Sequence, residues 1–364
     1  MPFRFLIFEF CAIVYASMKK TVKAACLTGI KKIKLVDLPI LPGEEKLLVR
    51  IKSCGCCGSD VHYYRDGKIG DAVCKYPHAI GHEPAGIVEK SVKGSSFKHG
   101  DRVAIEPGLH CGKCEFCLME RFNLCVNMKF LGTPPEQGAF QTHLFLDEKQ
   151  LVRIPDSMSY DEAAMLEPLG IAYHSVVNLS KIKPENTVAI FGAGPIGLLT
   201  MKMAKWLGCG TAFITDPLEY RLKFAKKHAS ADFTLNPEKT DIIAFIMDKT
   251  SGRGVDIAFD ACGVQQAIDQ CFASARIGGK AILTGIPQND NITYNPHPMR
   301  RKELEILNVR RSNRALEACL ELVTNGNIDV KPFITHNFSL ENIEEALEIA
   351  EAYKDNVIKI MINP

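Results

Sequence analysis

The sequence predicts an α/β fold in which a doubly wound parallel sheet is combined with a second, mostly β domain. Two observations support this. The chain has 364 residues, which is long for one hydrophobic core, and its texture changes near Thr187. Before that point Gly, Pro and short β-branched runs predominate, whereas after it apolar strands alternate with helical patterns.

The first part is expected to consist of short strands and turns, from Lys20 to about Val103. Residues 47–51 and 85–88 are its clearest strand candidates, because each is a short run rich in β-branched or small apolar residues. We therefore expect this domain to be built mainly from β-structure.

The second part has the alternation of a Rossmann fold. Helical patterns cover 196–207 and 221–228, and strands are expected at 188–191, 212–215, 257–260 and 280–284. After Arg310, two helical stretches at 314–324 and 340–352 precede a β-like run at 357–362. The pattern alone does not assign this tail to either domain.

The composition favours a small-molecule substrate. Hydrophobic residues make up 46% and charged residues 24% of the chain, and the formal net charge is +2. Because so small a net charge creates no large field of either sign, neither a nucleic acid nor an anionic membrane is expected as a partner.

Residues 1–17 need a separate interpretation, because the run from Phe3 to Ser17 is apolar and directly precedes Met18. A signal peptide is one reading, but Glu9 interrupts the run and Arg4 is the only basic residue ahead of it. The run is also too short to span a membrane. We favour a start at Met18, with residues 1–17 as an upstream extension.

A glycine-rich turn predicts a dinucleotide site. Gly192, Gly194 and Gly197 follow an apolar strand and open a helix, which is the arrangement that binds a pyrophosphate. Asp216 ends the next strand at about the expected distance, where a carboxylate accepts ribose hydroxyls and repels a 2′-phosphate. NAD is therefore favoured over NADP, although Arg221 nearby could accommodate a phosphate. Two further residues are counted with the cofactor site: Ile196 and Gly285.

Four cysteines predict a structural zinc site. Cys111, Cys114, Cys117 and Cys125 lie within fifteen residues, so their thiolates can surround one ion and leave no position open. An iron–sulfur cluster is the alternative, but the spacing departs from the common ferredoxin patterns.

Seven other cysteines lie among apolar neighbours and are expected to be buried thiols. They are Cys11, Cys26, Cys74, Cys209, Cys262, Cys271 and Cys319. Free thiols beside a thiolate cluster indicate a reducing compartment, so we expect a cytoplasmic protein.

A second, open metal site is indicated by Cys57 and His82. A catalytic zinc takes ligands from separated loops and keeps one position free. Considered singly, each residue has an ordinary alternative, a turn cysteine or a satisfied histidine. Asp60 is expected to accept a hydrogen bond from the other ring nitrogen of His82.

Taken together, these motifs resemble the zinc-containing medium-chain dehydrogenase/reductase superfamily. Finer matches are similar to its sorbitol (L-iditol 2-) dehydrogenase subfamily and cover essentially everything after Met18: Tyr63, 67–71, 104–108, 133–135, 166–169 and 301–304. The resemblance implies a GroES-like catalytic domain at 18–170, an NAD-binding Rossmann domain at 171–309, and a return to the catalytic domain at 310–364.

The resemblance also implies site residues that spacing alone does not identify. Glu167 becomes the third ligand of the catalytic zinc, with water or the alcohol in the fourth position, and Glu83 lies beside it, able to exchange with that water. Ser59 and His62 stand where these enzymes place a proton relay. For His62 the alternative is a solvent-facing residue that contacts only the cofactor.

The implied reaction is the oxidation of a polyol to a ketose, with hydride transfer to NAD and two zinc ions per chain. Tyr63, Glu167 and Arg311 are the expected substrate contacts. The tyrosine that commonly follows this arginine is replaced by Ser312, which puts sorbitol itself in question. Additional charge at Arg310 and Arg314 would suit a phosphorylated or carboxylated polyol, although solvated arginines are the more ordinary reading.

Three further expectations follow from the resemblance. The protein is expected to be a homotetramer. L-threonine dehydrogenase or another zinc alcohol dehydrogenase is the alternative enzyme. A non-catalytic structural relative is disfavoured, because such a protein would be expected to lose catalytic zinc ligands, and Cys57, His82 and Glu167 are all present.

Overall fold

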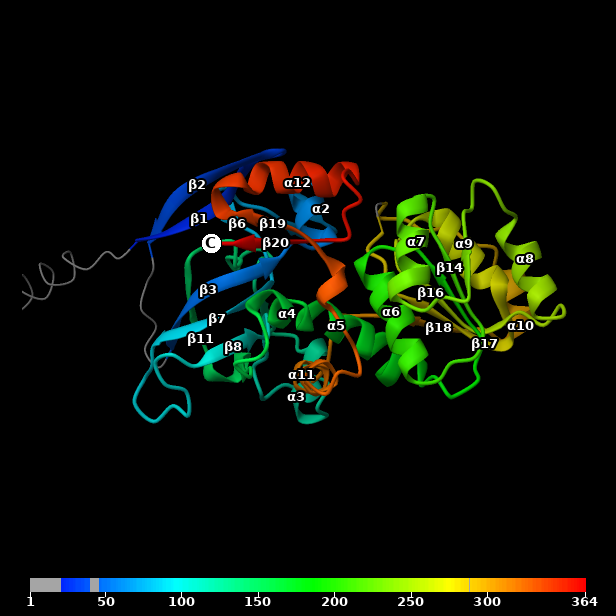
Figure 1. The fold of residues 1–364 in the computed structure, drawn as a ribbon, viewed down its shortest axis with the longest axis horizontal. Coiled ribbons are helices and arrows are strands. Elements are labelled where there is room, and N and C mark those ends of the chain that lie inside the picture. Colours follow the sequence, from blue (N-terminus) through cyan, green and yellow to red (C-terminus); the bar gives the residue numbers. More distant parts are fainter. Residues whose placement is uncertain (1–20, 40–45, 288) are drawn as a thin grey trace, which may run out of the picture.

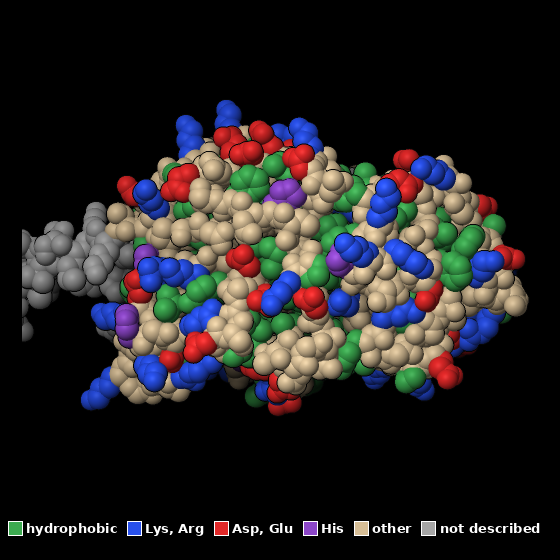
Figure 2. Space-filling view, viewed as in Figure 1, with side chains coloured by type: hydrophobic (Ala, Val, Ile, Leu, Met, Phe, Trp, Pro, Cys, Tyr) green, Lys and Arg blue, Asp and Glu red, His purple; other side chains and the backbone are tan. Residues whose placement is uncertain are grey.

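The computed structural model describes residues 21–39, 46–287 and 289–364, which form two lobes joined side by side (Figure 1). The expectations for residues 1–17, for the start at Met18 and for Cys11 lie outside the described residues. Over the face drawn in Figure 2, acidic and basic side chains are interspersed on both lobes. No helix of the described residues is long and apolar enough to cross a membrane.

The first lobe is mainly β, as predicted. Its strands are β1 (Thr21–Gly29), β2 (Lys32–Pro39), β3 (Leu47–Gly55), β4 (Lys68–Ile69), β5 (Ala72–Val73), β6 (His78–Ala79), β7 (Glu83–Lys90), β8 (Arg102–Ile105), β9 (Gly108–Leu109), β10 (Lys129–Phe130), β11 (His143–Leu146), β12 (Leu151–Arg153), β19 (Ile334–Ser339) and β20 (Lys359–Asn363). Its helices are α2 (Gly58–Asp66), α3 (Glu115–Leu118), α4 (Tyr160–Ala164), α11 (Leu316–Thr324) and α12 (Ile343–Ala352).

The main sheet of this lobe has seven strands and takes its last two from the C-terminus. The order is β12-β8-β7-β3-β20-β19, and β11 also pairs with β3. β20 lies antiparallel to β3, with Met361 opposite Gly55 and Ile362 opposite Cys54. The end of the chain therefore lies beside the strand that leads into Cys57.

The second lobe is a six-stranded parallel sheet with the order β15-β14-β13-β16-β17-β18. Its strands are β13 (Val188–Phe191), β14 (Ala212–Thr215), β15 (Phe233–Leu235), β16 (Val255–Asp260), β17 (Ala275–Leu283) and β18 (Glu305–Asn308). Its helices are α6 (Pro195–Trp206), α7 (Glu219–His228), α8 (Ile242–Lys249), α9 (Gln265–Ser274) and α10 (Pro296–Lys302).

The buried strands explain why the periodicity of this lobe could be read from the sequence. Every residue of β13, β14 and β16 is buried, as expected for strands covered on both faces by helices. Because β13 lies between β14 and β16, the direction of strand order reverses beside it, where doubly wound sheets bind their ligands.

The two lobes share one hydrophobic core along the helix α5 (Leu166–Tyr173). Leu166 and Leu169 of this helix belong to the same buried cluster as Ile190 of β13 and Leu198 of α6. In Figure 1, α5 and α6 lie where the lobes meet. The orientation of one lobe on the other is thus set by close packing rather than by a flexible linker.

The helical stretch expected at 340–352 is confirmed, as a short 3₁₀ turn followed directly by α12 (Ile343–Ala352). Two other expectations were wrong. The first hundred residues contain a helix, α2, which begins at the Cys57 cap, where the Asp60 carboxylate accepts the Cys57 N–H at 2.9 Å. Cys262 is half-buried, since it follows the end of β16 at the sheet edge. Five of the other predicted buried thiols are buried: Cys26, Cys74, Cys209, Cys271 and Cys319.

Candidate active site and zinc centres

Cys57, His82 and Glu83 converge at one end of the main sheet. Cys57 caps α2 just after β3, His82 directly precedes β7, and Glu83 is the first residue of β7. Since β3 and β7 are paired, with Gly55 opposite Glu83, the three side chains meet. Their ligand atoms all lie within 4.8 Å of one another.

Asp60 holds this group in position through contacts of its carboxylate. Its carboxylate is buried and accepts the backbone N–H groups of Cys57 and Gly81, each at 2.9 Å. Its Oδ1 also lies 3.5 Å from Nδ1 of His82, which agrees with the partner expected for this histidine. Nε2 of His82 is therefore left for the centre of the site, where the Cys57 thiol lies.

The groups around His82 stabilise a positive charge at this position. Burial by itself lowers the pKa of His82, but Asp60 and Cys57 raise it more, and the net shift is well above the ordinary value. Sulfur, imidazole and carboxylate ligands drawn from separate loops are those that zinc uses in open sites. The donor set and its charge thus fit a bound zinc ion.

Glu83 has an unexpected partner, Lys359 of β20. The two side chains form an ion pair, each only 1% exposed, and Nζ of Lys359 also donates to the carbonyl oxygen of Cys56 at 2.9 Å. Burial alone would lower the pKa of this lysine, but the Glu83 carboxylate raises it above the ordinary value. Lys359 thus stays charged and holds Glu83 in place.

Glu167, the expected third ligand, lies on the buried face of α5 but is not part of the three-residue group. Burial raises the pKa of its carboxyl to about 8, while His82 lowers it and Glu83 raises it further. Glu167 therefore interacts electrostatically with two members of this group, His82 and Glu83. The structure groups Glu83, rather than Glu167, with Cys57 and His82.

The expected relay residues point in different directions. Oγ of Ser59 lies 3.5 Å from Nε2 of His82. His62, one turn along α2, has its Nδ1 at 3.1 Å from an Arg65 nitrogen and 3.6 Å from Asp66. Burial and Arg65 lower the pKa of His62, so it is neutral at pH 7. Among the described residues, Ser59 and His62 share no hydrogen bond, and the relay stays a prediction.

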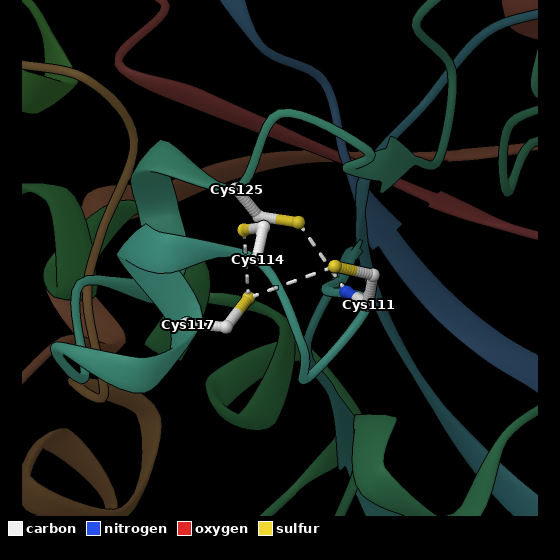
Figure 3. Close-up of side chains that lie close together, drawn as sticks. All are labelled: Cys111, Cys114, Cys117 and Cys125. Atoms are coloured by element: carbon white, nitrogen blue, oxygen red, sulfur yellow. Dashed lines mark hydrogen bonds between the residues drawn. The ribbon is translucent and has the colours of Figure 1, made fainter.

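The loop between β9 and β10, called here the four-cysteine loop, brings its four thiols into a compact group (Figure 3). The four sulfurs all lie within 4.8 Å of one another, with Cys114 and Cys117 3.5 Å apart and Cys111 and Cys117 4.0 Å apart. Four sulfurs about 2.3 Å from a central ion would be roughly 3.8 Å apart in a tetrahedron. The spacing fits one zinc ion and is too tight for a cluster of several iron atoms.

Backbone N–H groups in this loop lower the pKa of two of its four thiols. The N–H of Lys113 lowers the pKa of Cys111 to about 6, with further help from Asn127, whose side chain donates to the sulfur at 3.7 Å. The N–H of Cys117 likewise lowers the pKa of Cys114. Burial raises the pKa of Cys117, so these donors favour the zinc-binding thiolate form at Cys111 and Cys114.

The glycine-rich turn lies at the carboxyl end of β13, as predicted. A Cβ atom on Gly197 would lie 1.9 Å from the Gly192 carbonyl oxygen, so only glycine allows this close helix packing. At Gly194 a Cβ would meet only an Arg221 nitrogen, 3.9 Å away, which leaves open space above the first turn of α6. This opening and the free N–H groups of α6 fit a pyrophosphate. Ile196 is half-buried in the same turn.

Asp216 follows β14 at the same edge of the sheet. Its carboxylate is buried, accepts the N–H groups of Ala193 and Leu218 at 2.9 Å, and lies 3.5 Å from Arg221. Asp216 thus ties the strand end to the glycine-rich turn. Gly285 follows β17, where a Cβ would lie 2.1 Å from the Gly263 nitrogen, so close backbone packing explains this glycine.

Tyr63 and Arg311 interact electrostatically with each other, Tyr63 with His82 and Arg311 with Glu167. Tyr63 is buried on α2, and Arg311 is half-buried with its guanidinium 3.8 Å from the centre of the Phe130 ring. The Phe130 ring in turn lies 5.7 Å from the His82 ring. Arg310 and Arg314 are exposed, and Arg314 pairs with Glu120 at 3.2 Å.

Sequence reasoning missed Lys359, Phe130 and Glu106 as neighbours of the site. Glu106 is half-buried and interacts electrostatically with Arg311, and desolvation raises its pKa to about 7. Only Lys359 carried a usable signal, because a lysine inside the apolar run 357–362 is unusual in a buried strand.

Comparison with known proteins places the chain among zinc enzymes. The alcohol dehydrogenase GroES-like domain matches residues 43–156, and the zinc-binding dehydrogenase family matches residues 195–325. The chain is 37% identical to a sorbitol dehydrogenase of Bacillus subtilis, over 96% of the chain and 99% of that protein. It is also 37% identical to an L-idonate 5-dehydrogenase of Vitis vinifera, over 93% of the chain and 94% of that protein.

Solved structures share the fold over most of the chain. A zinc-binding dehydrogenase of Sinorhizobium meliloti 1021 bound to NADP matches with a TM-score of 0.86 and 27% identity, over 95% of this chain and all of that one. The fold thus recurs in a protein whose structure was solved with a nicotinamide dinucleotide bound.

Proposed function

The chain belongs to the zinc-containing medium-chain dehydrogenase/reductase family, and on that basis we propose that it oxidises a secondary hydroxyl group of a polyol to a ketose with NAD. The observation that carries this proposal is the convergence of Cys57, His82 and Glu83 on one open site. The names of the sorbitol and L-idonate dehydrogenase relatives indicate polyol-like substrates.

The proposed domain boundaries follow the order of the chain. We assign residues 18–170 and 310–364 to the catalytic domain and 171–309 to the dinucleotide domain. The pairing of β20 with β3 supports the return of the C-terminal segment. The six parallel strands of the second lobe support the middle assignment, because all lie between residues 188 and 308.

Zinc bound at the open site would polarise the alcohol oxygen as a Lewis acid, and bound NAD would accept the hydride. Cys57 and His82 would hold the ion, with Glu167 or Glu83 completing the set. Asp60 keeps His82 in the tautomer that presents Nε2. Ser59, 3.5 Å from that nitrogen, and His62 are the residues proposed to carry the hydroxyl proton toward solvent.

The second zinc would be structural. Cys111, Cys114, Cys117 and Cys125 supply four thiolates and leave no position for a substrate. Bound there, zinc would fix the loop that joins β9 to β10.

NAD is the proposed oxidant. The buried Asp216 carboxylate, at the end of β14, would repel a 2′-phosphate. Arg221 works against this preference, but its position 3.5 Å from Asp216 means that part of its charge is already compensated. The ratio of kcat/KM with NAD to that with NADP measures the preference, and a value below one refutes the assignment.

The free thiols of the described residues support a reducing, cytoplasmic location, and the family resemblance supports a homotetramer. Both remain proposals. The mass of the native assembly in solution tests the second.

The decisive experiment measures NADH formation with xylitol, sorbitol, inositols and L-threonine, beside a zinc count per chain. We expect turnover with polyols and two zinc ions. Turnover with threonine alone would replace the proposal with L-threonine dehydrogenase, and a chain that binds NAD but turns over no alcohol would refute an enzymatic role.

A further inference from the structure

Three segments that are distant in the sequence meet at His174, where polar side chains join them. The side chains of His174 and Asn123 are buried, and the ring has its Nε2 3.4 Å from the amide nitrogen of Asn123. Its Nδ1 lies 3.1 Å from the amide nitrogen of Asn178. Asn123 also donates to the carbonyl oxygen of Arg310 at 2.9 Å. The four-cysteine loop, the helix that follows Glu167 and the segment that returns to the first lobe are therefore tied together at this histidine.

The His174 ring is neutral and has a defined place for its proton. Burial lowers the pKa of His174 to about 4, with a smaller contribution from Arg121. A neutral imidazole donates at one nitrogen and accepts at the other. Because the amide nitrogen of Asn123 has two hydrogens, it can donate both to Arg310 and to Nε2, which places the ring proton on Nδ1. Buried polar networks of this kind favour a single arrangement of the segments that they join.

Glu167 and His174 lie on the same face of one helix. Glu167 belongs to the first turn of α5, and His174 caps the end of this helix with helical backbone angles. His174 lies seven positions after Glu167, which corresponds to about two turns of an α-helix, so both side chains point to the same side. Between them α5 packs closely on the returning segment: a Cβ on Gly170 would lie 3.4 Å from that of Ala315 and 3.5 Å from that of Ser312.

The end of α5 needs an anchor, because the chain continues there as a π-helix, His174–Ser180. A π-helix pairs residues five apart instead of four, so the regular hydrogen bonds of α5 end where His174 stands. A side-chain tip about 5–6 Å from the helix axis moves by roughly 1 Å when the helix rotates by about 10°. Metal–ligand distances tolerate only about 0.2 Å. A small rotation of α5 would therefore be enough to displace a carboxylate from a metal ion.

The other end of the anchor is held by the four-cysteine loop. The Asn313 side chain accepts the Phe122 N–H at 2.9 Å and donates to the Glu120 carbonyl oxygen at 3.0 Å. Together with the bond from Asn123 to Arg310, these contacts attach the returning segment, which leads into α11, to the loop that contains α3 (Figure 1). The position of Asn123 thus depends on the same loop that the structural zinc would close.

From this geometry we propose that His174 is a positioning residue, which holds Glu167 at the open metal site by anchoring α5 to the four-cysteine loop through Asn123. The inference rests on the proposed function, which places Glu167 among the groups that would hold the catalytic zinc. Glu167 interacts electrostatically with His82 and Glu83 of that site. His174 acts on Glu167 through α5, since two helical turns separate them. The four-cysteine loop would thereby contribute to the metal affinity of the other site.

The test measures the Kd of the open site for Zn²⁺ by competition with a chromophoric chelator, on protein whose four-cysteine loop retains its zinc. We expect His174→Leu to raise this Kd roughly 10–100-fold, which is the range typical of groups that orient metal ligands. His174→Gln keeps one donor and one acceptor and should stay within about threefold of the wild type. Asn123→Ala leaves the helix untouched and should raise the Kd roughly fivefold, as expected for the loss of one hydrogen bond.

The same measurement in a Glu167→Gln background separates positioning from a general loss of structure. Cys57 and His82 remain in this variant, so a Kd can still be measured. If His174 acts through Glu167, His174→Leu should change the Kd by less than about threefold in this background, because the two substitutions are coupled. The matched control is His228→Leu, which removes a half-buried ring from α7 of the second lobe and should leave the Kd unchanged in both backgrounds.

The outcomes separate the proposal from the function on which it rests. A Kd raised roughly tenfold or more in His174→Leu, and restored in His174→Gln, supports the proposal if the effect disappears in Glu167→Gln. An unchanged Kd in His174→Leu overturns it, and so does an effect of equal size in Glu167→Gln, which would show that His174 acts on the fold alone. If His174→Leu does not fold, Asn123→Ala decides by the same comparison. Wild-type protein that binds zinc only at the four-cysteine loop contradicts the proposed function itself.

Discussion

Replacing Lys359 by Met removes the positive charge beside Glu83 while keeping a long, flexible side chain of similar volume. Both members of the pair are 1% exposed, so no solvent is available to compensate the carboxylate that remains. The variant also loses the hydrogen bond to the Cys56 carbonyl oxygen. We expect Lys359→Met to destabilise the catalytic domain strongly and to lower its zinc content.

The loss in free energy of unfolding caused by Lys359→Met can be estimated in two ways. Breaking a buried ion pair by removing one partner typically costs about 3–5 kcal/mol. The alternative for the protein is to protonate the carboxyl group, which for an ordinary glutamic acid costs about 3.7 kcal/mol at pH 7 and about 1.6 kcal/mol at pH 5.5. The expected loss is therefore roughly 3–4 kcal/mol at pH 7, and about half of that at pH 5.5.

The sign of this pH dependence comes from the carboxyl group alone. The pKa of Lys359 lies above its ordinary value, so the contribution of the lysine is complete below pH 10 and constant between pH 5.5 and 7. Urea unfolding of the variant and of the wild type at both pH values gives the two differences in free energy. The double variant Lys359→Met/Glu83→Gln should recover most of the loss, because no buried charge remains.

The matched control is Lys239→Met. Lys239 pairs with Glu219 at 2.7 Å, but both side chains are more than half exposed, and its removal should leave the urea midpoint unchanged within error. The reasoning fails if Lys359→Met costs less than about 1 kcal/mol at pH 7, if the cost does not fall at pH 5.5, or if the double variant is as unstable as the single one.

Three further predictions concern the metal, the dinucleotide domain and the support of Arg311. Cys57→Ser should lower the zinc content from two ions to one per chain and abolish NADH formation. Titration with NADH should show nearly unchanged cofactor binding. Retained turnover would contradict the assignment of Cys57 as a ligand of the catalytic zinc. Asp256 accepts hydrogen bonds from Arg253, Arg276 and Thr187, and although burial raises its pKa, the two arginines hold it below the ordinary value. Asp256→Asn should therefore cost about 2–4 kcal/mol in urea unfolding at pH 7, and the difference should narrow as the pH falls below about 4; a pH-independent difference would contradict the linkage. Asn313→Ala removes two hydrogen bonds to the four-cysteine loop. It should raise KM for the preferred substrate roughly tenfold while two zinc ions per chain are retained. An unchanged KM would show that this loop does not position Arg311.

Much of the fold could be predicted because its signals are local. The strands 188–191 and 212–215 have the predicted bounds, since buried parallel strands are continuous apolar runs. The helix α2 was missed for the opposite reason: its residues are mostly polar, and its start depends on a hydrogen bond from Cys57 to Asp60.

The candidate site was only partly accessible from the sequence. Cys57 and His82 could be singled out by residue type, but Glu167 required the family resemblance. The pairing of Lys359 with Glu83 joins residues that lie far apart in the sequence, and no spacing rule connects them. The stacking of Arg311 on Phe130 likewise depends on how two separate segments pack.

The position of β20 has a consequence for the order in which the protein can be made. Synthesis from the end of β12, at Arg153, to the start of β20, at Lys359, adds about 200 residues, which takes roughly 10–40 s on a ribosome. The dinucleotide domain can fold during that interval, because all six of its strands have emerged by Asn308. The sheet around β3 is complete only after β20 has been synthesised, and Glu83 receives its counter-charge at that point.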